Sequence, residues 1–579
     1  MPSLSGIFNL AAQALGAFQA GIAVAGDNIA NANTEGYSRQ RLNLATEMPI
    51  RLPEAIYGMG VKIQGIERLR DEALDIRIRQ QSASNGFLTQ SRDIYNELQT
   101  TLQDSLGIVS ADLNATGDVG LNHALIRFFD AFGELALEPE SSQARTLVIE
   151  QTRSLITTFH AADEGLKGFR RNLNEQVPFL VDEVNTLAEQ VANLNKKIGV
   201  LELGGARKAN TLRDERGRLL KELSEIVPIQ IREQPNGAVN INLGGLTLVS
   251  GGRSVDMVYT RRDGDPNGTF DLFMEGNNAQ RLDRVIDAGK LGAVLEARDV
   301  TIPEFMDRLE KLASAIITEV NRIHTVAMGS VPFRSLNAGN AVDESSLPLN
   351  LAGFDHPMTA GSFDIGILDE NGDPLETYSI AVDPTTDSID DIAQRIDAAD
   401  GVVGGGAIEA TVGANGILNI SANGTQQFRF TADSSGFLSA AGLNTFFSGS
   451  GSGNINLSSL VESNLAYIAA SAMGAPGDGS AAMQIAALRD TGVMNGGTTS
   501  IIDHYEAIVS SMGMQGRRNE ELAVNSQALL ESLEHRQEEF AGVSVDEEAV
   551  EMMRYQRAFQ AAARLISTVD EMMETLVNL

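Results

Sequence analysis

The two ends of this 579-residue chain carry the same apolar pattern, in which hydrophobic residues recur in alternating steps of three and four. This spacing keeps an apolar seam on one side of a helix, and such a seam needs a helical partner. We therefore predict a terminal α-helical coiled coil built from both chain ends. The N-terminal seam is Leu4, Phe8, Ala11, Leu15, Phe18, Ile22, Ala25 and Ile29, and the C-terminal seam is Met552, Tyr555, Phe559, Ala562, Ile566, Val569, Met573 and Leu576. The alternative, two ordinary amphipathic helices on a globular body, is disfavoured because chain ends are usually frayed.

The first segment is apolar enough to resemble a signal peptide or a membrane span. A signal peptide begins with basic residues, whereas the first charge here is Asp27 and the first cation is Arg39. A span needs about twenty predominantly apolar residues. Here the run is interrupted by Ser3, Ser5, Asn9, Gln13 and Gln19. We expect a helix that packs against other helices, with no membrane insertion.

Further seams predict a long helical bundle made from both halves of the chain. One seam covers residues 177–201, where Pro178 is expected to mark a boundary or a kink, and another covers residues 302–323. We interpret these inner seams as intramolecular core. A third seam contains Ile501, Tyr505, Ile508, Met512, Leu522, Leu529, Leu533 and Phe540.

The centre of the chain has the alternation and the turns of β structure. Residues 239–243 alternate between apolar and polar side chains, and Asn-Gly and Gly-Gly pairs separate the runs around them. Ser388 and Asp391 are expected to cap a short helix between two hairpins, and the Ser/Gly run at 448–453 is expected to be a flexible linker.

The predicted fold is therefore mainly α with β insertions. The predicted domains are a terminal coiled coil (1–45 with 541–579), a helical bundle (46–226 with 289–335 and 455–540), a small β domain (227–288) and a β-rich insertion module (350–450).

Composition excludes several classes of function. A formal net charge of −33 argues against nucleic acid as a partner, because phosphate binding needs clustered Lys and Arg. There are no cysteines, and the six histidines form none of the short-spaced pairs that hold zinc. The sequence also lacks a phosphate-binding glycine loop. We predict no metal, no cofactor and no catalytic residue.

A polar motif follows the first helix. It contains Asn28, Asn31, Asn33, Thr34, Gly36 and Tyr37. Physically this is a helix end, because Asn competes for backbone hydrogen bonds and Gly36 tolerates positive φ. The motif resembles the signature of bacterial flagellar axial proteins, the rod, hook and hook-associated proteins. Ser38-Arg39 is closest to the hook-associated group, since hook and rod proteins more often place Lys there. The C-terminal stretch around Tyr555 and Phe559 is similar to the same family, and Ser544 with Glu547 predicts a capping box at its start.

The resemblance implies a structural function, as the junction layer between hook and filament. It implies export as an unfolded chain through the flagellar type III apparatus. The implied partners are further copies of the chain in a ring-like assembly, the hook protein, the next hook-associated junction protein and an export chaperone. The seam residues of both ends are the candidate assembly interface. A hook or rod protein remains an alternative, and so does an enzyme in the central β region with helical ends as its anchor.

Overall fold

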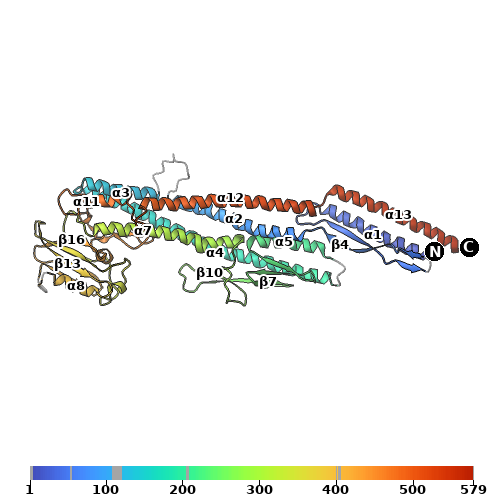
Figure 1. The fold of residues 1–579 in the computed structure, drawn as a ribbon, viewed down its shortest axis with the longest axis horizontal. Helices are drawn as coiled ribbons and strands as arrows, with labels where there is room; N and C mark the ends of the chain where they lie inside the picture. Colours follow the sequence, from blue (N-terminus) through green and yellow to red (C-terminus); the bar gives the residue numbers. More distant parts are fainter. Residues whose placement is uncertain are drawn as a thin grey trace. The chain divides into compact units, whose positions relative to one another are not determined.

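The computed structural model describes residues 4–52, 55–106, 120–203, 208–399, 401 and 406–577. Its contacts define two compact units that alternate along the sequence. Unit 1 contains residues 1–94, 171–299 and 516–579, and unit 2 contains residues 95–170 and 300–515. The predicted fold class is confirmed, because the chain is mainly helical with small antiparallel sheets (Figure 1).

In unit 1 the two chain ends lie side by side as a helical pair, named α1 (Leu4–Ala30) and α13 (Val545–Val577) (Figure 1). A β-hairpin packs on α1 through both of its long strands. The antiparallel strands of this hairpin are β1 (Gln40–Thr46) and β4 (Val61–Arg68), with β2 (Ile50–Leu52) paired to β3 (Ala55–Tyr57) between them.

Long helices form the body of both units. Helices α2, α4 and α12 each continue from one unit into the other, whereas α5 and α6 belong to unit 1 and α3, α7 and α11 to unit 2. A short π-helix, η1, joins α6 to α7. The bounds are α2 (Glu72–Leu106), α3 (Leu121–Leu137), α4 (Ser142–Leu201), α5 (Asn210–Ile226), α6 (Gly289–Glu296), η1 (Ala297–Thr301), α7 (Ile302–His324), α11 (Ser480–Ala487) and α12 (Ile501–Ala541).

The expected helix boundary at Pro178 is not observed. Helix α4 runs for 60 residues and Pro178 lies inside it. A proline there removes one backbone hydrogen bond. On both sides of it, however, Val177, Val181 and Val184 are fully buried, and this packing holds the helix together. The predicted seam of α4 is otherwise observed, except that Leu201 is exposed at its end.

The predicted seam of α12 is buried only in its first part. The seam is buried from Ile501 to Met512, but Leu522, Leu529 and Phe540 are exposed. The buried residues in the later part are Ala523, Ser526, Leu530 and Ala541, which occupy a neighbouring face. A strict three-four repeat drifts by about 20° per heptad on a straight helix. The predicted seam therefore rotates away from the core along α12.

The first β region lies on α4 in unit 1. One sheet has the order β5-β6-β7-β8, and β9 pairs with β10 in a separate hairpin. Three asparagines of α4 hold these strands, because Asn174, Asn185 and Asn195 each accept a backbone N–H and donate to a backbone carbonyl. The strands are β5 (Gln230–Glu233), β6 (Val239–Leu243), β7 (Leu246–Ser250), β8 (Arg253–Ser254), β9 (Met257–Arg261) and β10 (Phe270–Met274).

The second β region belongs to unit 2 and has its own buried core. One sheet has the order β13-β12-β16 and the other β11-β15-β14. The predicted cap is confirmed, since Ser388 and Asp391 form a capping box on α8. The elements are β11 (Ser335–Asn337), η2 (Leu349–Leu351), β12 (Gly361–Leu368), β13 (Pro374–Val382), α8 (Ile389–Asp397), β14 (Ile408–Val412), β15 (Leu418–Ala422), β16 (Gln427–Asp433) and α9 (Phe437–Ala441).

The Ser/Gly run at 448–453 is an ordered turn, which corrects the expected flexible linker. The carboxylate of Glu310 on α7 accepts from the N–H and the hydroxyl of Ser452, at 2.8 and 2.7 Å. Ser452 is 1% exposed. The short elements around this turn are β17 (Phe447–Ser448), β18 (Asn456–Leu457), α10 (Ser459–Ser463) and η3 (Leu465–Tyr467).

Candidate assembly site at the paired chain ends

Small residues bring α1 and α13 together. Ala11, Ala17 and Ala25 are almost fully buried, at 0 to 2% exposed. A methyl group added to Gly21 would lie 2.8 Å from the ring of Tyr555, so α13 approaches α1 closely at this glycine. A larger residue at position 21 would therefore push the two helices apart.

The predicted seam residues of the two paired helices have different degrees of burial. On α13, Val569 is buried at 3% exposed, whereas Met573 is 41% exposed. On α1, Phe8 is 40% exposed. The side chains of Leu4 and Leu576 lie outside the described residues. The half-buried members are Leu15, Phe18, Ile22 and Ile29 on α1, with Met552, Tyr555, Phe559 and Ile566 on α13.

Asn28 forms the central hydrogen bonds of the polar motif, and its side chain is fully buried. Its amide nitrogen donates to the backbone carbonyl of Gln40 and to Oε2 of Glu548, each at 2.9 Å. Its Oδ1 accepts from the N–H of Gln40 at 3.0 Å and from the hydroxyl of Tyr37 at 2.9 Å. One side chain therefore joins α1, the start of β1 and the first turn of α13.

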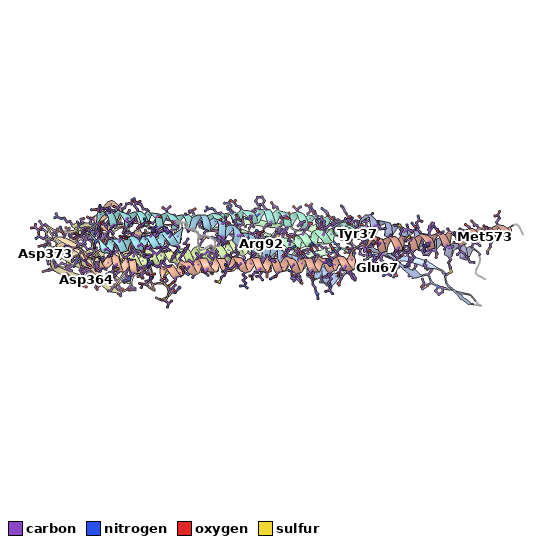
Figure 2. The ribbon with its side chains drawn as sticks, turned by 90° about the horizontal axis from the view of Figure 1, so that it is seen from above. Tyr37, Glu67, Arg92, Asp364, Asp373 and Met573 are labelled. Carbon is purple, nitrogen blue, oxygen red and sulfur yellow. The ribbon has the colours of Figure 1, made fainter. Side chains whose placement is uncertain are left out.

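Tyr37 lies at the end of the helical pair opposite to Met573 (Figure 2). Its hydroxyl is also 3.2 Å from Oδ2 of Asp27 and accepts from Nε2 of Gln40 at 3.2 Å. Burial, followed by the neighbouring charge of Asp27, raises the pKa of Tyr37 well above its usual range. The phenol therefore stays protonated and remains a hydrogen-bond donor at any physiological pH.

Arg39 ties the motif to the C-terminal helix. Its guanidinium donates to Glu548 at 2.7 Å and to Glu547 at 2.9 Å, and its N–H donates to the carbonyl of Ala541 at 2.8 Å. Ser544 Oγ accepts the N–H of Glu547 at 3.4 Å, which is one half of the predicted capping box. The Glu547 carboxylate meets Arg39, so this residue links two segments as well as opening α13.

Asp214 of α5 fastens the motif to the bundle. Its carboxylate accepts from the N–H and the hydroxyl of Ser38, at 3.2 and 2.9 Å, and from Arg68 of β4 at 2.7 Å. Arg70 lies 3.4 Å from the same carboxylate and 2.6 Å from Asp75 of α2. Asp214 is 5% exposed, so these bonds are made in a largely water-free setting.

The other motif residues shape the turn. Asn31 donates to the carbonyl and the carboxylate of Asp27, and its Oδ1 accepts from the Thr34 hydroxyl at 3.3 Å. Gly36 has a φ of +78°, which a side chain would strain. Asn33 is exposed. We define the motif network as Asn28, Tyr37, Arg39, Asp214 and Glu548.

Sequence reasoning missed Asp214 as part of this network. It is 176 residues away from its partner Ser38, and nothing in the local pattern of α5 distinguishes it from a surface acid. The available signal was the run of four consecutive charged residues from Arg213 to Arg216, which marks the segment without singling out Asp214.

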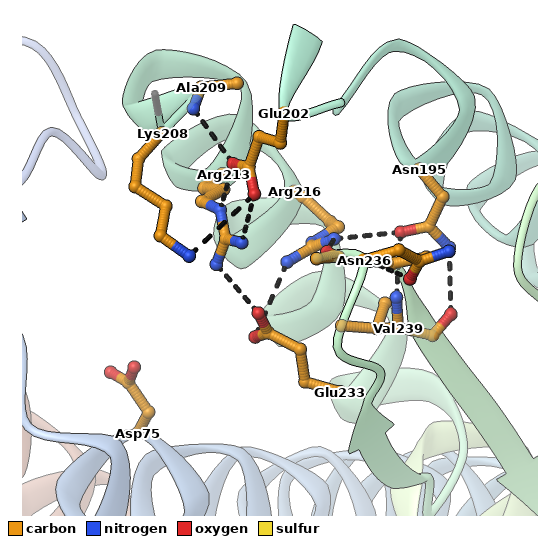
Figure 3. Close-up of polar contacts among 12 residues, drawn as sticks. Asp75, Asn195, Glu202, Lys208, Ala209, Arg213, Arg216, Glu233, Asn236 and Val239 are labelled. Atoms are coloured by element: carbon orange, nitrogen blue, oxygen red, sulfur yellow. Dashed lines mark hydrogen bonds and ion pairs between the residues drawn. The ribbon is translucent and has the colours of Figure 1, made fainter. Parts of the chain in front are cut away.

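A cleft of about 480 Å³ lies next to the network in unit 1. Arg213 donates to both oxygens of Glu202, at 2.7 and 2.8 Å, and to Glu233 at 2.8 Å (Figure 3). Arg216 donates to Oδ1 of Asn195, and burial lowers its pKa to about 10. These contacts join α4, α5 and β5, so the arginines of the cleft act as structural ties.

Two further features bear on the chemistry of unit 1 and of the chain. The stretch Gly6–Ala30 is long and apolar enough to cross a membrane by length and composition alone. In the structure this helix contacts α13, β1 and β4. Among the described residues, no group of three or more His, Asp or Glu side chains could hold a metal ion.

Three sequence families match separate parts of the chain. Residues 8–37 match "Flagella basal body rod protein" and residues 537–579 match "Flagellar basal body rod FlgEFG protein C-terminal". These matches cover the two paired ends and the motif, and they define the class as a flagellar axial protein. Residues 109–331 match "Flagellar hook-associated protein FlgK helical domain".

Full-length relatives narrow the class. Flagellar hook-associated protein 1 of Bacillus subtilis is 26% identical, over 98% of this chain and 97% of the relative. The protein of the same name from Escherichia coli is 24% identical over all of both chains. The solved flagellar hook junction protein FlgK of Burkholderia pseudomallei has the same fold, with a TM-score of 0.52 and 15% identity over 81% of this chain and 100% of its own. Over nearly its whole length the chain is therefore similar to flagellar hook-associated protein 1.

Proposed function

We propose that this chain is a structural subunit of the bacterial flagellum, which forms the junction layer between hook and filament and allows the filament to assemble. The observation that carries the proposal is the pair α1–α13. Its helices cover each other only in part, and Phe8, Leu565 and Met573 remain about 40% exposed. Exposed apolar side chains along a paired helix are typical of surfaces that bind further protein.

The same observation supports self-association through the terminal pair. Phe18 and Phe559 are half-buried seam residues, so a neighbouring copy has apolar surface left to cover. Covering one such side chain contributes roughly 1.5–3 kcal/mol at most, and a ring repeats that contribution in every subunit. The seam residues of both ends are accordingly the proposed assembly interface.

The proposed location and partners follow from the family. We place the protein outside the cell, at the hook–filament junction, after export through the flagellar type III apparatus. Its proposed partners are further copies of itself, the hook protein, the next hook-associated junction protein and an export chaperone. The net charge of −33 supports a protein partner over nucleic acid.

A structural role is also favoured over an enzymatic one. The relatives are named as flagellar hook-associated proteins. In the cleft beside the motif network, Arg213 is bound to carboxylates and Arg216 to a backbone carbonyl, which is the chemistry of a structural tie. We propose that the chain has no catalytic function.

The proposal is tested by electron microscopy of a strain that lacks the protein. We expect hooks without filaments, with filament subunit released into the medium, and recovery when the chain is supplied again. Normal filaments in the deletion strain would contradict the proposal. Loss of the hooks themselves would indicate a hook or rod protein instead.

A further inference from the structure

The later half of α12 carries apolar side chains on its exposed side. Leu522, Leu529 and Phe540 are 39, 51 and 55% exposed. The buried side of the same segment is partly polar, where Nε2 of Gln81 donates to Ser526 Oγ at 2.8 Å and Asn85 Nδ2 donates to Gln527 at 2.8 Å. Polar side chains therefore pair with α2 while Leu522 and Leu529 face outward, which is unusual for a helix whose outer side meets only water.

This apolar stripe is flanked by cations. Arg518 and Arg536 lie on the same side of the helix as the stripe, four residues before Leu522 and four before Phe540. Both arginines are exposed, and within the described parts of the chain neither forms an ion pair. The five residues are named the α12 stripe, and they span 22 residue steps, or roughly 33 Å.

A complementary surface lies on α4 in the same unit. Phe179 is 76% exposed, and Val200, 21 positions later on nearly the same face, is 67% exposed. The acids Glu175, Asp182 and Glu189 lie between or beside them, are exposed, and form no ion pair within the described residues. Two exposed lysines, Lys196 and Lys197, stand near the far end. These residues are named the α4 face, which has about the same length as the stripe.

Helix α5 separates the two surfaces within one copy. Arg216 of α5 bonds to Asn195 of α4, whereas Lys221 of α5 pairs with Glu534 of α12. In Figures 1 and 2, α4 and α12 lie on different sides of unit 1. The stripe and the α4 face therefore stay exposed in one molecule, and a second molecule is needed to bring them together.

We propose that the α12 stripe of one copy binds the α4 face of the next copy, in a heterologous contact. The inference rests on the proposed assembly role and names the surfaces that carry it. A chain of net charge −33 repels itself, and pairing unbound arginines with unbound carboxylates around apolar anchors offsets that repulsion where the copies touch. A heterologous contact repeats from copy to copy, so it builds a ring or a helical layer.

Cross-linking tests the contact directly because the chain has no cysteine of its own. Phe179→Cys and Leu529→Cys are introduced in separate full-length proteins, and a short bis-maleimide is added to the mixture. The mixture is tested both on isolated hooks and in concentrated solution. We expect dimers only when both variants are present, and ladders when one chain carries both changes. Glu538→Cys, on another exposed side of α12, replaces Leu529→Cys as the control and should give no dimer.

Charge reversal provides an independent measurement. Arg518→Glu with Arg536→Glu should lower the yield of cross-linked product by roughly tenfold, since close pairs across an interface contribute well over 1 kcal/mol. Adding Glu175→Arg and Glu189→Arg to the same chain should restore the yield, because these two acids have nearly the separation of the two arginines along their helices. Circular dichroism checks that each exposed substitution leaves the helices intact.

The outcomes separate this contact from the proposed function. Protein that incorporates onto hooks but gives no product between positions 179 and 529, or gives only products between identical positions, would overturn the contact and leave the function standing. Protein that fails to incorporate onto hooks would refute the proposed function. In that event, cross-linking in concentrated solution alone tests the contact. A product between positions 179 and 529 would support the contact, and its absence would refute it.

Discussion

At the scale of single residues, the motif network explains why an asparagine stands at position 28. Its amide donates to Glu548 and to the carbonyl of Gln40, while its oxygen accepts from Tyr37 and from the N–H of Gln40. Aspartate has the same shape but only accepts hydrogen bonds, and it would place a second carboxylate against Glu548. Alanine would remove the side-chain partner of both backbone groups of Gln40, whereas Tyr37 would keep Asp27 and Glu548 would keep Arg39.

Replacing Asn28 should therefore destabilise the terminal pair. We expect Asn28→Ala to cost about 1–3 kcal/mol, because buried polar groups lose their partners, and Asn28→Asp to cost more near neutral pH. Hydrogen exchange of α13 amides measures the effect. The control is Asn33→Ala in the same motif, which is exposed and should change protection little. Equal exchange in Asn28→Ala and the parent would show that the network does not hold the chain ends.

A buried histidine makes unit 2 sensitive to acid. His324 is 0% exposed, with Nδ1 2.8 Å from the carbonyl of Asn444 and Nε2 accepting the N–H of Ala469 at 2.9 Å. Burial lowers its pKa from 6.5 to about 4. The unfolded chain thus binds a proton more readily than the folded one between these values. This contribution to stability is complete above pH 6.5 and is lost as the pH falls toward 4.

We expect the free energy of unfolding of unit 2 to fall by a few kcal/mol across that window, since each pKa unit corresponds to about 1.4 kcal/mol. Denaturant unfolding followed at a series of pH values measures the slope. In His324→Gln the part of the slope that comes from this residue should disappear, whereas His535→Gln, at an exposed position, should keep it. An unchanged slope in His324→Gln would contradict the assignment.

At the scale of elements, local patterns predicted the helices and strands better than their faces. The three-four repeat correctly predicted the buried sides of α4 and α7. Over a short stretch, the repeat stays aligned with the side of the helix that faces the core. Over the length of α12 the phase drifts, so Leu522 and Leu529 are exposed while Ala523 and Leu530 are buried. The turn at 448–453 was missed for a different reason. Its partner, Glu310, is more than 140 residues away, and local composition carries no information about it.

The second β region offers natural points for excision. The N–H of Gly339 donates to the carbonyl of Gly442 at 3.0 Å, so the two glycines already lie together. Removing residues 340–441 and joining these glycines should leave the helices of unit 2 folded, with Leu336→Ser added because the excision uncovers that side chain. Circular dichroism and incorporation onto hooks measure the result.

The matched comparison is removal of residues 350–450, the module expected from sequence. This deletion also takes Asn444, which donates to three backbone carbonyls, and Phe446 and Phe447, which contact Phe128. We expect it to unfold part of unit 2. If both deletions behaved alike, the boundary at the glycine pair would be wrong. If the shorter one folded but failed to incorporate, the β region would be part of the junction.

At the scale of the whole molecule, the sequence predicted the pairing of the two ends because each seam lacked a local partner. The motif identified the family, but its physical role could not be read from sequence. Asn28 and Glu548 are 520 residues apart, and Ser38 meets Asp214 across 176 residues. Such contacts depend on the tertiary fold, so the pattern revealed the motif residues without revealing what they hold.

The central claim is that the terminal pair is the joint of the assembly, and incorporation of purified protein onto isolated hooks tests it most directly. Phe559→Asp places a charge in the half-buried seam, whereas Gln560→Asp places the same charge at the exposed neighbouring position. The account predicts that both variants keep the helical content of the body, that Gln560→Asp caps hooks like the parent, and that Phe559→Asp does not. Normal capping by Phe559→Asp would contradict it, as would unfolding of the body in that variant.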